Sequence, residues 1–283
     1  MSYNTNKEYT AVARYLTWTV SLAMLIVSST ARAHDPVFGI GPHVLFKGGV
    51  EVAIEAEREE AGDETERALA LELTYGITGD WAAGIELPYV SNEDGADKSN
   101  GAGDIRLFTK YRFWRQDSLG LQQSAAVLLK VKFDSGDHNQ SPPLGTGTTD
   151  AILGLTYGYE GRKWYRWASL RYRFNDKNDA GIDRGDKVLF DLVGGVRPTL
   201  TSYLEPDTVW LLELNGEYGQ QSKQNGITLN NTGGTEIFLS PGIFWTRRNL
   251  AIKAGVQIPI YSDLKGIQDE SDYRAKAVIE WHL

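Results

Sequence analysis

The chain has 283 residues, a formal net charge of −8 and no cysteine. Without cysteine there is no disulfide framework, no thiol catalysis and no cysteine-ligated zinc. The acidic balance argues against nucleic acid as a partner, because nucleic acid is itself a polyanion.

The N-terminal residues have the pattern of a secretion signal. Lys7 and Arg14 precede an apolar run over residues 15–27, and Ala31-Arg32-Ala33 follows it. The run is about a dozen residues long, shorter than the ~20 that a membrane-spanning helix needs. We expect residues 1–33 to be a secretory signal peptide cleaved after Ala33, and residues 34–283 to form one domain. A retained anchor helix is the alternative.

The mature chain is a series of strand-like segments in which apolar and polar residues alternate. No later apolar stretch reaches the length of a membrane helix, so a membrane crossing would have to use strands. In residues 250–260, for example, every even-numbered residue is apolar. About twelve such segments are expected, near 43–57, 65–78, 80–90, 103–116, 121–134, 148–160, 163–175, 186–197, 207–221, 233–246, 249–262 and 271–283.

The connections between these segments alternate between short and long. Short turns are expected at 79–80, 117–120, 161–162 and 246–249, with a somewhat longer connection at 198–206. Long polar loops are expected at 58–64, 91–102, 135–147, 176–185, 222–232 and 262–270. Short turns on one side and long loops on the other are typical of outer-membrane barrels, whose short turns face the periplasm.

The C-terminus lies inside a strand, since residues 273–283 alternate to the last residue. An exposed terminal edge strand invites aggregation, whereas a barrel that pairs its last strand with its first has no edge. We therefore predict an all-β fold, a transmembrane antiparallel up-and-down barrel of about 12 strands, in the outer membrane of a Gram-negative bacterium. A soluble barrel or sandwich is the alternative.

The charged face of the strands should line the lumen. A barrel of this size is roughly 25 Å across its backbone, and side chains would narrow the opening to about 10 Å. The charges either fill the interior by pairing, or line a hydrated channel for small solutes. The predicted pore-lining residues are Glu51, Glu55, Glu72, Glu86, Arg106, Lys110, Arg112, Lys130, Lys132, Arg171, Arg173, Asp191, Glu213, Lys253, Arg274 and Lys276.

The four histidines offer only weak indications of chemistry. His34, at the expected mature N-terminus, and His43 together have the donors for copper. His138 and Ser141 share a polar loop, which would fit a lipid-modifying hydrolase, but their spacing differs from the His-x-Ser-Asn type of outer-membrane phospholipases. His282 is interpreted as polar wall. We expect no catalytic residue, no metal and no cofactor. The expected partners are outer-membrane lipids and lipopolysaccharide, a small-molecule solute and the barrel-assembly machinery.

One segment carries a family resemblance. Residues 101–113, Gly-Ala-Gly-Asp-Ile-Arg-Leu-Phe-Thr-Lys-Tyr-Arg-Phe, resemble the G-x-G-D-φ-x-φ-x-x-K-Y-R-F strand of outer-membrane transporters encoded with phenol and aromatic-compound (meta-cleavage) degradation pathways. Residues 87–89 and 240–243 are similar to that family as well, while the terminal Leu283 departs from the usual aromatic residue. The resemblance implies a barrel and solute uptake; it does not identify the solute, and aromatic compounds are the candidates it suggests. A closed structural or adhesion barrel is a further alternative.

Within that strand, Arg106, Lys110 and Arg112 fall on the face expected to point inward. Glu86 lies on the same face of the preceding strand. We expect these four charges to dominate the electrostatics of the pore.

Overall fold

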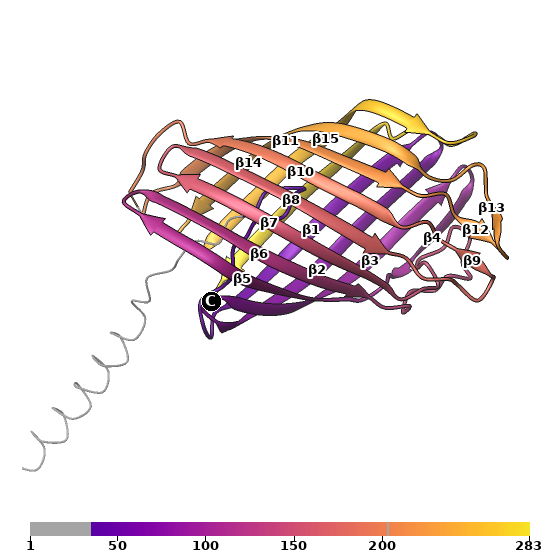
Figure 1. Ribbon diagram of the computed structural model, residues 1–283, viewed down its shortest axis with the longest axis horizontal. Helices are drawn as coiled ribbons and strands as arrows, with labels where there is room; N and C mark the ends of the chain where they lie inside the picture. Colours follow the sequence, from indigo (N-terminus) through magenta and orange to yellow (C-terminus); the bar gives the residue numbers. More distant parts are fainter. Residues whose placement is uncertain (1–34, 203) are drawn as a thin grey trace, which may run out of the picture. The chain divides into compact units, whose positions relative to one another are not determined.

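The computed structural model describes residues 35–202 and 204–283, so the expected signal peptide and His34 lie outside the described residues. Within them, twelve strands form a closed antiparallel barrel (Figure 1). In chain order these are β1 (Val50–Ala61), β2 (Glu64–Thr78), β3 (Trp81–Asp94), β5 (Arg106–Ser118), β6 (Leu121–Lys132), β7 (Asp150–Gly161), β8 (Trp164–Phe174), β10 (Lys187–Val196), β11 (Asp207–Gly219), β14 (Gly234–Arg247), β15 (Leu250–Leu264) and β16 (Tyr273–His282).

The remaining strands lie in the connections. β4 (Asp97–Ala102) pairs with residues 89–94 of β3. The earlier part of β3, residues 81–86, pairs with β5. β9 (Ile182–Asp183), β12 (Lys223–Gln224) and β13 (Ile227–Thr228) form a small separate sheet. No helix among the described residues is long and apolar enough to span a membrane.

The first and last strands close the barrel. β1 pairs with β16 from Glu51 opposite His282 to Glu60 opposite Tyr273, while its other edge pairs with β2. Val50 and Leu283 exchange backbone hydrogen bonds at the end of this seam. The all-β barrel and the pairing of its terminal strand are thus confirmed, because closure leaves no free edge.

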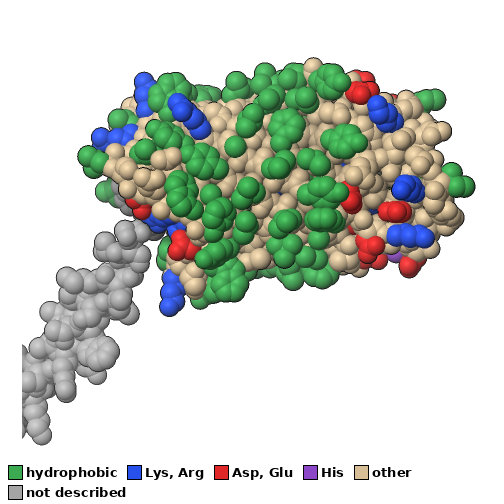
Figure 2. Space-filling model, viewed as in Figure 1, with side chains coloured by type: hydrophobic (Ala, Val, Ile, Leu, Met, Phe, Trp, Pro, Cys, Tyr) green, Lys and Arg blue, Asp and Glu red, His purple; other side chains and the backbone are tan. Residues whose placement is uncertain are grey.

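The outer face of the barrel is apolar. On β2, Leu69, Leu71, Leu73 and Tyr75 are exposed, whereas the alternate residue Ala70 is buried. Figure 2 shows hydrophobic side chains spread over the side of the barrel and charged ones gathered towards its ends. Such a surface is stable against lipid, and it identifies the fold as an outer-membrane β-barrel with the short turns at the periplasmic end.

Two expectations about the connections were wrong. The connection at 58–64 is a tight turn at residues 62–63, where Gly62 has a φ of 56°. The expected loop at 91–102 is mostly a hairpin of β3 and β4 that turns at Gly95, also at a φ of 56°. A positive φ is inexpensive for glycine, and this allows the strands to continue past the expected loop positions. Long loops remain at 133–149, 175–186, 220–233 and 265–272.

The first strand begins at Val50 rather than near residue 43. Residues 35–49 form no strand and lie inside the barrel, where they contact several of its strands; we call them the N-terminal plug. Pro36 and Pro42 lack the amide that a β-ladder needs, and Gly39 and Gly41 weaken strand structure between them.

Candidate solute pathway in the barrel lumen

The strand register places all sixteen predicted pore-lining residues on the inner face. Glu72 lies opposite Glu86, Glu86 opposite Arg106, and Arg106 opposite Lys132, so these four share one face across β2, β3, β5 and β6. Directly opposed residues project to the same side of a sheet. The inward direction was therefore predictable from alternation alone, whereas a role in conduction stays a prediction.

Most of these charges pair along the wall with neighbouring strands. Glu86 binds Arg106 and, at 2.9 Å, Lys130 Nζ. Lys276 Nζ lies 2.7 Å from Glu55 and 3.0 Å from Glu57. Glu86 therefore partners Arg106 and Lys130 rather than Lys110 and Arg112. Pairs of this kind compensate buried charge without crossing the lumen.

The loop 133–149 is tied down at the extracellular end by Asp104. This carboxylate accepts hydrogen bonds from Lys132 Nζ at 2.8 Å, Gly136 N at 2.9 Å and Thr146 N at 3.0 Å. Burial by itself would raise the pKa of Asp104, but these hydrogen bonds outweigh it and hold the pKa below its usual value.

A second buried carboxylate gathers basic side chains beside that loop. Asp150 has no exposed side-chain surface, and its Oδ2 lies 3.2 Å from Lys132, 3.3 Å from Arg184 and 3.4 Å from Arg173. Lys132 therefore bridges Asp104 and Asp150. Lys132 and Arg173 face inward as predicted, but they hold the mouth of the barrel together.

The N-terminal plug is anchored mainly through its backbone. The Glu213 carboxylate accepts Val37 N at 2.7 Å and Gly39 N at 2.9 Å, and Thr156 Oγ1 donates to the Ile40 carbonyl at 2.8 Å. Glu213, on β11, is completely buried. Since the plug has no ladder of its own, its backbone amides need acceptors from the wall.

Two side chains of the plug, one at its start and one near its middle, add ion pairs. Lys110 Nζ, on β5, lies 2.7 Å from Asp35 Oδ2, and His43 binds Glu160 at the end of β7. Together with Glu213, these pairs tie the plug to β5, β7 and β11. Sequence reasoning missed this function for Asp35 and His43, although the Pro and Gly content before Val50 was a signal against a strand.

Glycines on the inner wall make room for the plug. A Cβ on Gly158 would lie 2.8 Å from Pro42 Cγ, one on Gly242 3.0 Å from Val37 Cγ2, and one on Gly255 3.0 Å from Phe38 Cε2. These glycines come from β7, β14 and β15 and face inward. The inner wall is thus complementary in shape to the plug, because glycine in a strand often marks a place where another backbone segment approaches closely.

A cavity of about 290 Å³ remains beside the plug. Phe38, Val44 and Leu45 of the plug line one side, and inward residues of β1, β2, β3, β5, β6, β8, β15 and β16 line the rest. A second cavity, of about 150 Å³, shares Phe38, Glu57, Arg171 and Lys276 with the first. The predicted residues that line one or both cavities are Glu51, Glu55, Glu72, Glu86, Arg106, Lys110, Lys130, Arg171, Asp191, Lys253, Arg274 and Lys276.

Arg112 contributes differently from what we expected. Its Nε donates to Asp80 Oδ1 at 2.9 Å and its Nη2 to the Gly79 carbonyl at 2.6 Å. It therefore braces the periplasmic turn between β2 and β3 and is absent from the lining of both cavities described above.

The histidine alternatives find little geometric support. Among the described residues His138 approaches Asp134, with Nδ1 3.6 Å from Oδ1, and it has no contact with Ser141. The imidazole of His43 pairs with the carboxylate of Glu160. The copper hypothesis also needs His34, which lies outside the described residues.

Known proteins resemble this chain in sequence and in fold. The family model described as "Putative MetA-pathway of phenol degradation" matches residues 33–263. The crystal structure of the COG4313 outer membrane channel from Pseudomonas putida F1 superposes with a TM-score of 0.68 at 15% identity, covering 88% of this chain and 100% of that one. The NanC porin superposes with a TM-score of 0.52 at 11% identity, covering 82% and 100%. No curated protein matches the sequence.

Proposed function

The chain belongs to this phenol-degradation family, and from its charged, partly filled lumen we propose that it is an outer-membrane channel for the passive passage of small solutes. The observation that carries the proposal is the cavity of about 290 Å³ between the N-terminal plug and the inner wall. The channel and porin among the similar folds support the same function.

The lining of the cavity suits a small solute that combines an apolar and a polar part. Phe38, Phe108 and Leu128 contribute apolar surface, while Arg106 and Glu72 contribute charge. Its volume is at the lower end of the range for small-molecule sites, roughly 300–1,000 Å³. We propose single-ring aromatic compounds with polar substituents as the solutes, in keeping with the family description. No energy source or covalent chemistry is part of this proposal.

One observation favours a second candidate, a closed barrel. The N-terminal plug is bonded to the wall on several sides, through Glu213, Thr156 and Lys110. If the plug stays in place, the protein would act through its loops and not as a channel. A hydrolase is not supported, because His138 and Ser141 make no contact within the described residues.

Single-channel recording of the refolded mature protein in a planar bilayer tests the proposal. We expect discrete conductance steps from preparations that migrate as a folded, heat-modifiable barrel. Glu213→Ala, which removes the main anchor of the plug, should raise the conductance or the open probability. If neither protein conducts although both are folded, the channel is refuted and the closed barrel is supported.

The solute class is tested in the same bilayer. A phenol or benzoate added to one side should interrupt the current briefly as it occupies the cavity. A non-aromatic sugar of similar size serves as the control. Equal interruption by both compounds would contradict the aromatic preference while leaving the channel intact.

A further inference from the structure

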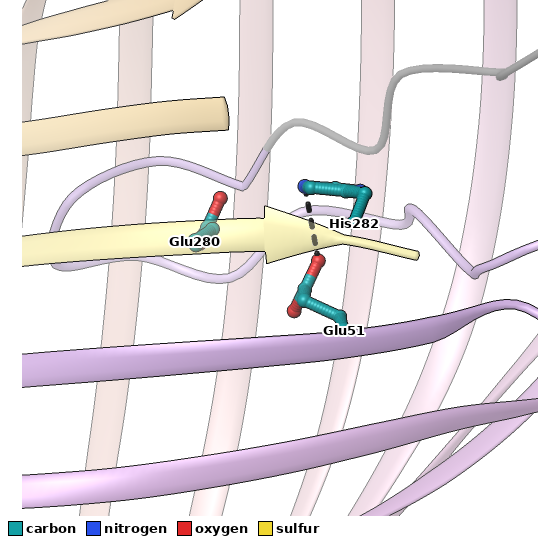
Figure 3. Close-up of side chains that lie close together, drawn as sticks. All are labelled: Glu51, Glu280 and His282. Atoms are coloured by element: carbon teal, nitrogen blue, oxygen red, sulfur yellow. Dashed lines mark ion pairs between the residues drawn. The ribbon is translucent and has the colours of Figure 1, made fainter. Parts of the chain in front are cut away.

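A histidine and two carboxylates meet at the periplasmic end of the barrel seam. Glu280 and His282 are two positions apart on β16, so both project inward, and Glu51 of β1 lies directly opposite His282. Figure 3 shows Glu280 and His282 on β16 and Glu51 on β1, with the ion pair between His282 and Glu51. They come from the first and last strands of the barrel and can meet only because the sheet is closed.

The distances fit a metal ion. His282 Nε2 lies 3.3 Å from Glu51 Oε2, and one ligand atom from each of the three residues lies within 4.8 Å of the others. Bonds of ~2.0–2.2 Å in a tetrahedral zinc site place the ligand atoms roughly 3.4 Å apart. The pair of His282 and Glu51 already has this spacing, and the ligand atom of Glu280 lies within 4.8 Å of both.

The charges around the site leave a negative excess. Lys253 Nζ binds one oxygen of Glu280, Oε1, and a carboxylate has two. Glu72 of β2 faces the same cavity as Glu51 and Glu280, yet no cationic side chain among the described residues pairs with it. Its hydrogen bond comes from the Thr74 hydroxyl, at 3.1 Å. Lys130 acts on Glu72 electrostatically, so next to the strand seam the two carboxylates of Glu51 and Glu280 have one ammonium group, that of Lys253, beside them. Uncompensated buried charge is costly.

Space for an ion and its water is present on the cavity side. Glu51, Glu72, Glu280 and Lys253 all line the cavity of about 290 Å³. An ion bound by Glu51, Glu280 and His282 would keep a coordination position open towards this cavity. Glu72, on the neighbouring strand β2, would then offset the remaining positive charge.

From this geometry we propose that Glu51, Glu280 and His282 form a binding site for one divalent transition-metal ion of the zinc class, which joins the first and last strands. Imidazole nitrogen with carboxylate oxygen suits Zn²⁺ and its first-row neighbours, whereas Mg²⁺ and Ca²⁺ prefer sites of oxygen alone. The site departs from our expectation of no metal and gives His282 a function beyond that of polar wall. It is also independent of the conduction proposed above.

Metal titration of the untagged, chelator-treated barrel in detergent tests the site. Co²⁺ serves as the spectroscopic probe, because its visible absorption reports coordination, and the chain has no thiolate that would confuse the spectrum. We expect one Co²⁺ per barrel, displaced by Zn²⁺ and not by Mg²⁺. His282→Gln and Glu51→Gln should each weaken Co²⁺ binding by at least about tenfold. Loss of a group that only supports a ligand already weakens metal binding by about 10- to 100-fold, and loss of a ligand should do no less.

His138→Gln is the matched control, since it also removes a histidine beside carboxylates, those of Asp134 and Asp137, but in an exposed loop outside the proposed site. It should bind Co²⁺ as the unchanged protein does. Zn²⁺ should also raise the unfolding temperature of the unchanged protein and not that of His282→Gln. Binding that survives both site substitutions in folded barrels, or no binding at all, would overturn the site. Because no current is measured, this result is separate from the outcome for the channel.

Discussion

At the scale of single residues, buried carboxylates organise the inside of the barrel. Glu213 accepts backbone amides of the N-terminal plug, Asp104 accepts those of the loop 133–149, and Asp150 gathers basic side chains at the mouth. Each compensates groups that would otherwise be buried without a partner. Alternation predicts that Glu213 points inward, but it does not indicate that its partner is a backbone 176 residues earlier in the chain.

Replacing Glu213 should release the plug in graded steps. Glu213→Ala leaves two buried amides without acceptors, at a cost of about 1–3 kcal/mol for each unsatisfied group. Glu213→Gln keeps one carbonyl oxygen and should have a smaller effect. The open probability in bilayer recordings should therefore increase from the unchanged protein to Gln to Ala. An equal effect of both substitutions would contradict the role of the carboxylate as an anchor for two amides.

The Asp104 anchor should fail in acid. Its folded pKa is lowered, so its contribution to stability is present above the unfolded value of about 3.9 and is lost as the pH falls through the folded value. A spin label at Asn139→Cys should thus stay immobile from neutral pH down to about pH 4 and become mobile only at pH values below the unfolded value of about 3.9. In an Asp104→Asn background it should be mobile at neutral pH. A label at Ile267→Cys, in another extracellular loop, is the control and should not respond to Asp104→Asn.

At the scale of elements, the plug and its wall are complementary. The plug contacts β7, β11, β14 and β15 through backbone hydrogen bonds and through glycines that leave room for its side chains. The charged residues of the remaining cavity come mostly from β1, β2, β3, β5 and β6, with others from β8, β15 and β16. The proposed pathway therefore runs beside the plug, which also pairs with β5 through Lys110.

Replacing one of the inner-wall glycines by a larger residue should displace the plug while the β-barrel itself stays folded. Gly158→Val introduces side-chain atoms where Pro42 packs, and overpacking of this kind costs about 1–3 kcal/mol. We expect more frequent opening in bilayer recordings, with unchanged heat-modifiable migration. Gly194→Val is the matched control, because a Cβ there meets nothing within 4 Å. Equal behaviour of the two variants would show that the fit at Gly158 does not hold the plug.

At the scale of the whole molecule, closure of the sheet decides which charges meet. The seam of β1 and β16 brings Glu51 next to His282 and Lys276 next to Glu55, pairs more than 200 positions apart in the chain. The lining of the larger cavity has seven carboxylates, from Asp35, Glu51, Glu55, Glu57, Glu72, Glu86 and Glu280. Its six cationic groups are those of Arg106, Lys110, Lys130, Arg171, Lys253 and Lys276.

This small excess of carboxylates predicts a weak preference for cations. The reversal potential in a salt gradient should move towards cation selectivity in Lys130→Gln and towards anion selectivity in Glu72→Gln, because both residues line the cavity. The preference should decrease near 1 M salt, where the Debye length is about 3 Å. Lys98→Gln, at the exposed tip of the β3–β4 hairpin, should leave it unchanged. Opposite shifts would place the conducting path elsewhere.

The sequence by itself determined the strands, their inward and outward faces and the closure of the barrel. These follow from local alternation and from turn residues, and the inward direction of residues such as Glu86 and Lys130 follows with them. Only the tertiary structure decided that residues 35–49 fill part of the lumen, that Arg112 braces a turn, and that Glu51, Glu280 and His282 meet. Such contacts join positions far apart in the chain, so they depend on strand register and closure, which no local pattern records.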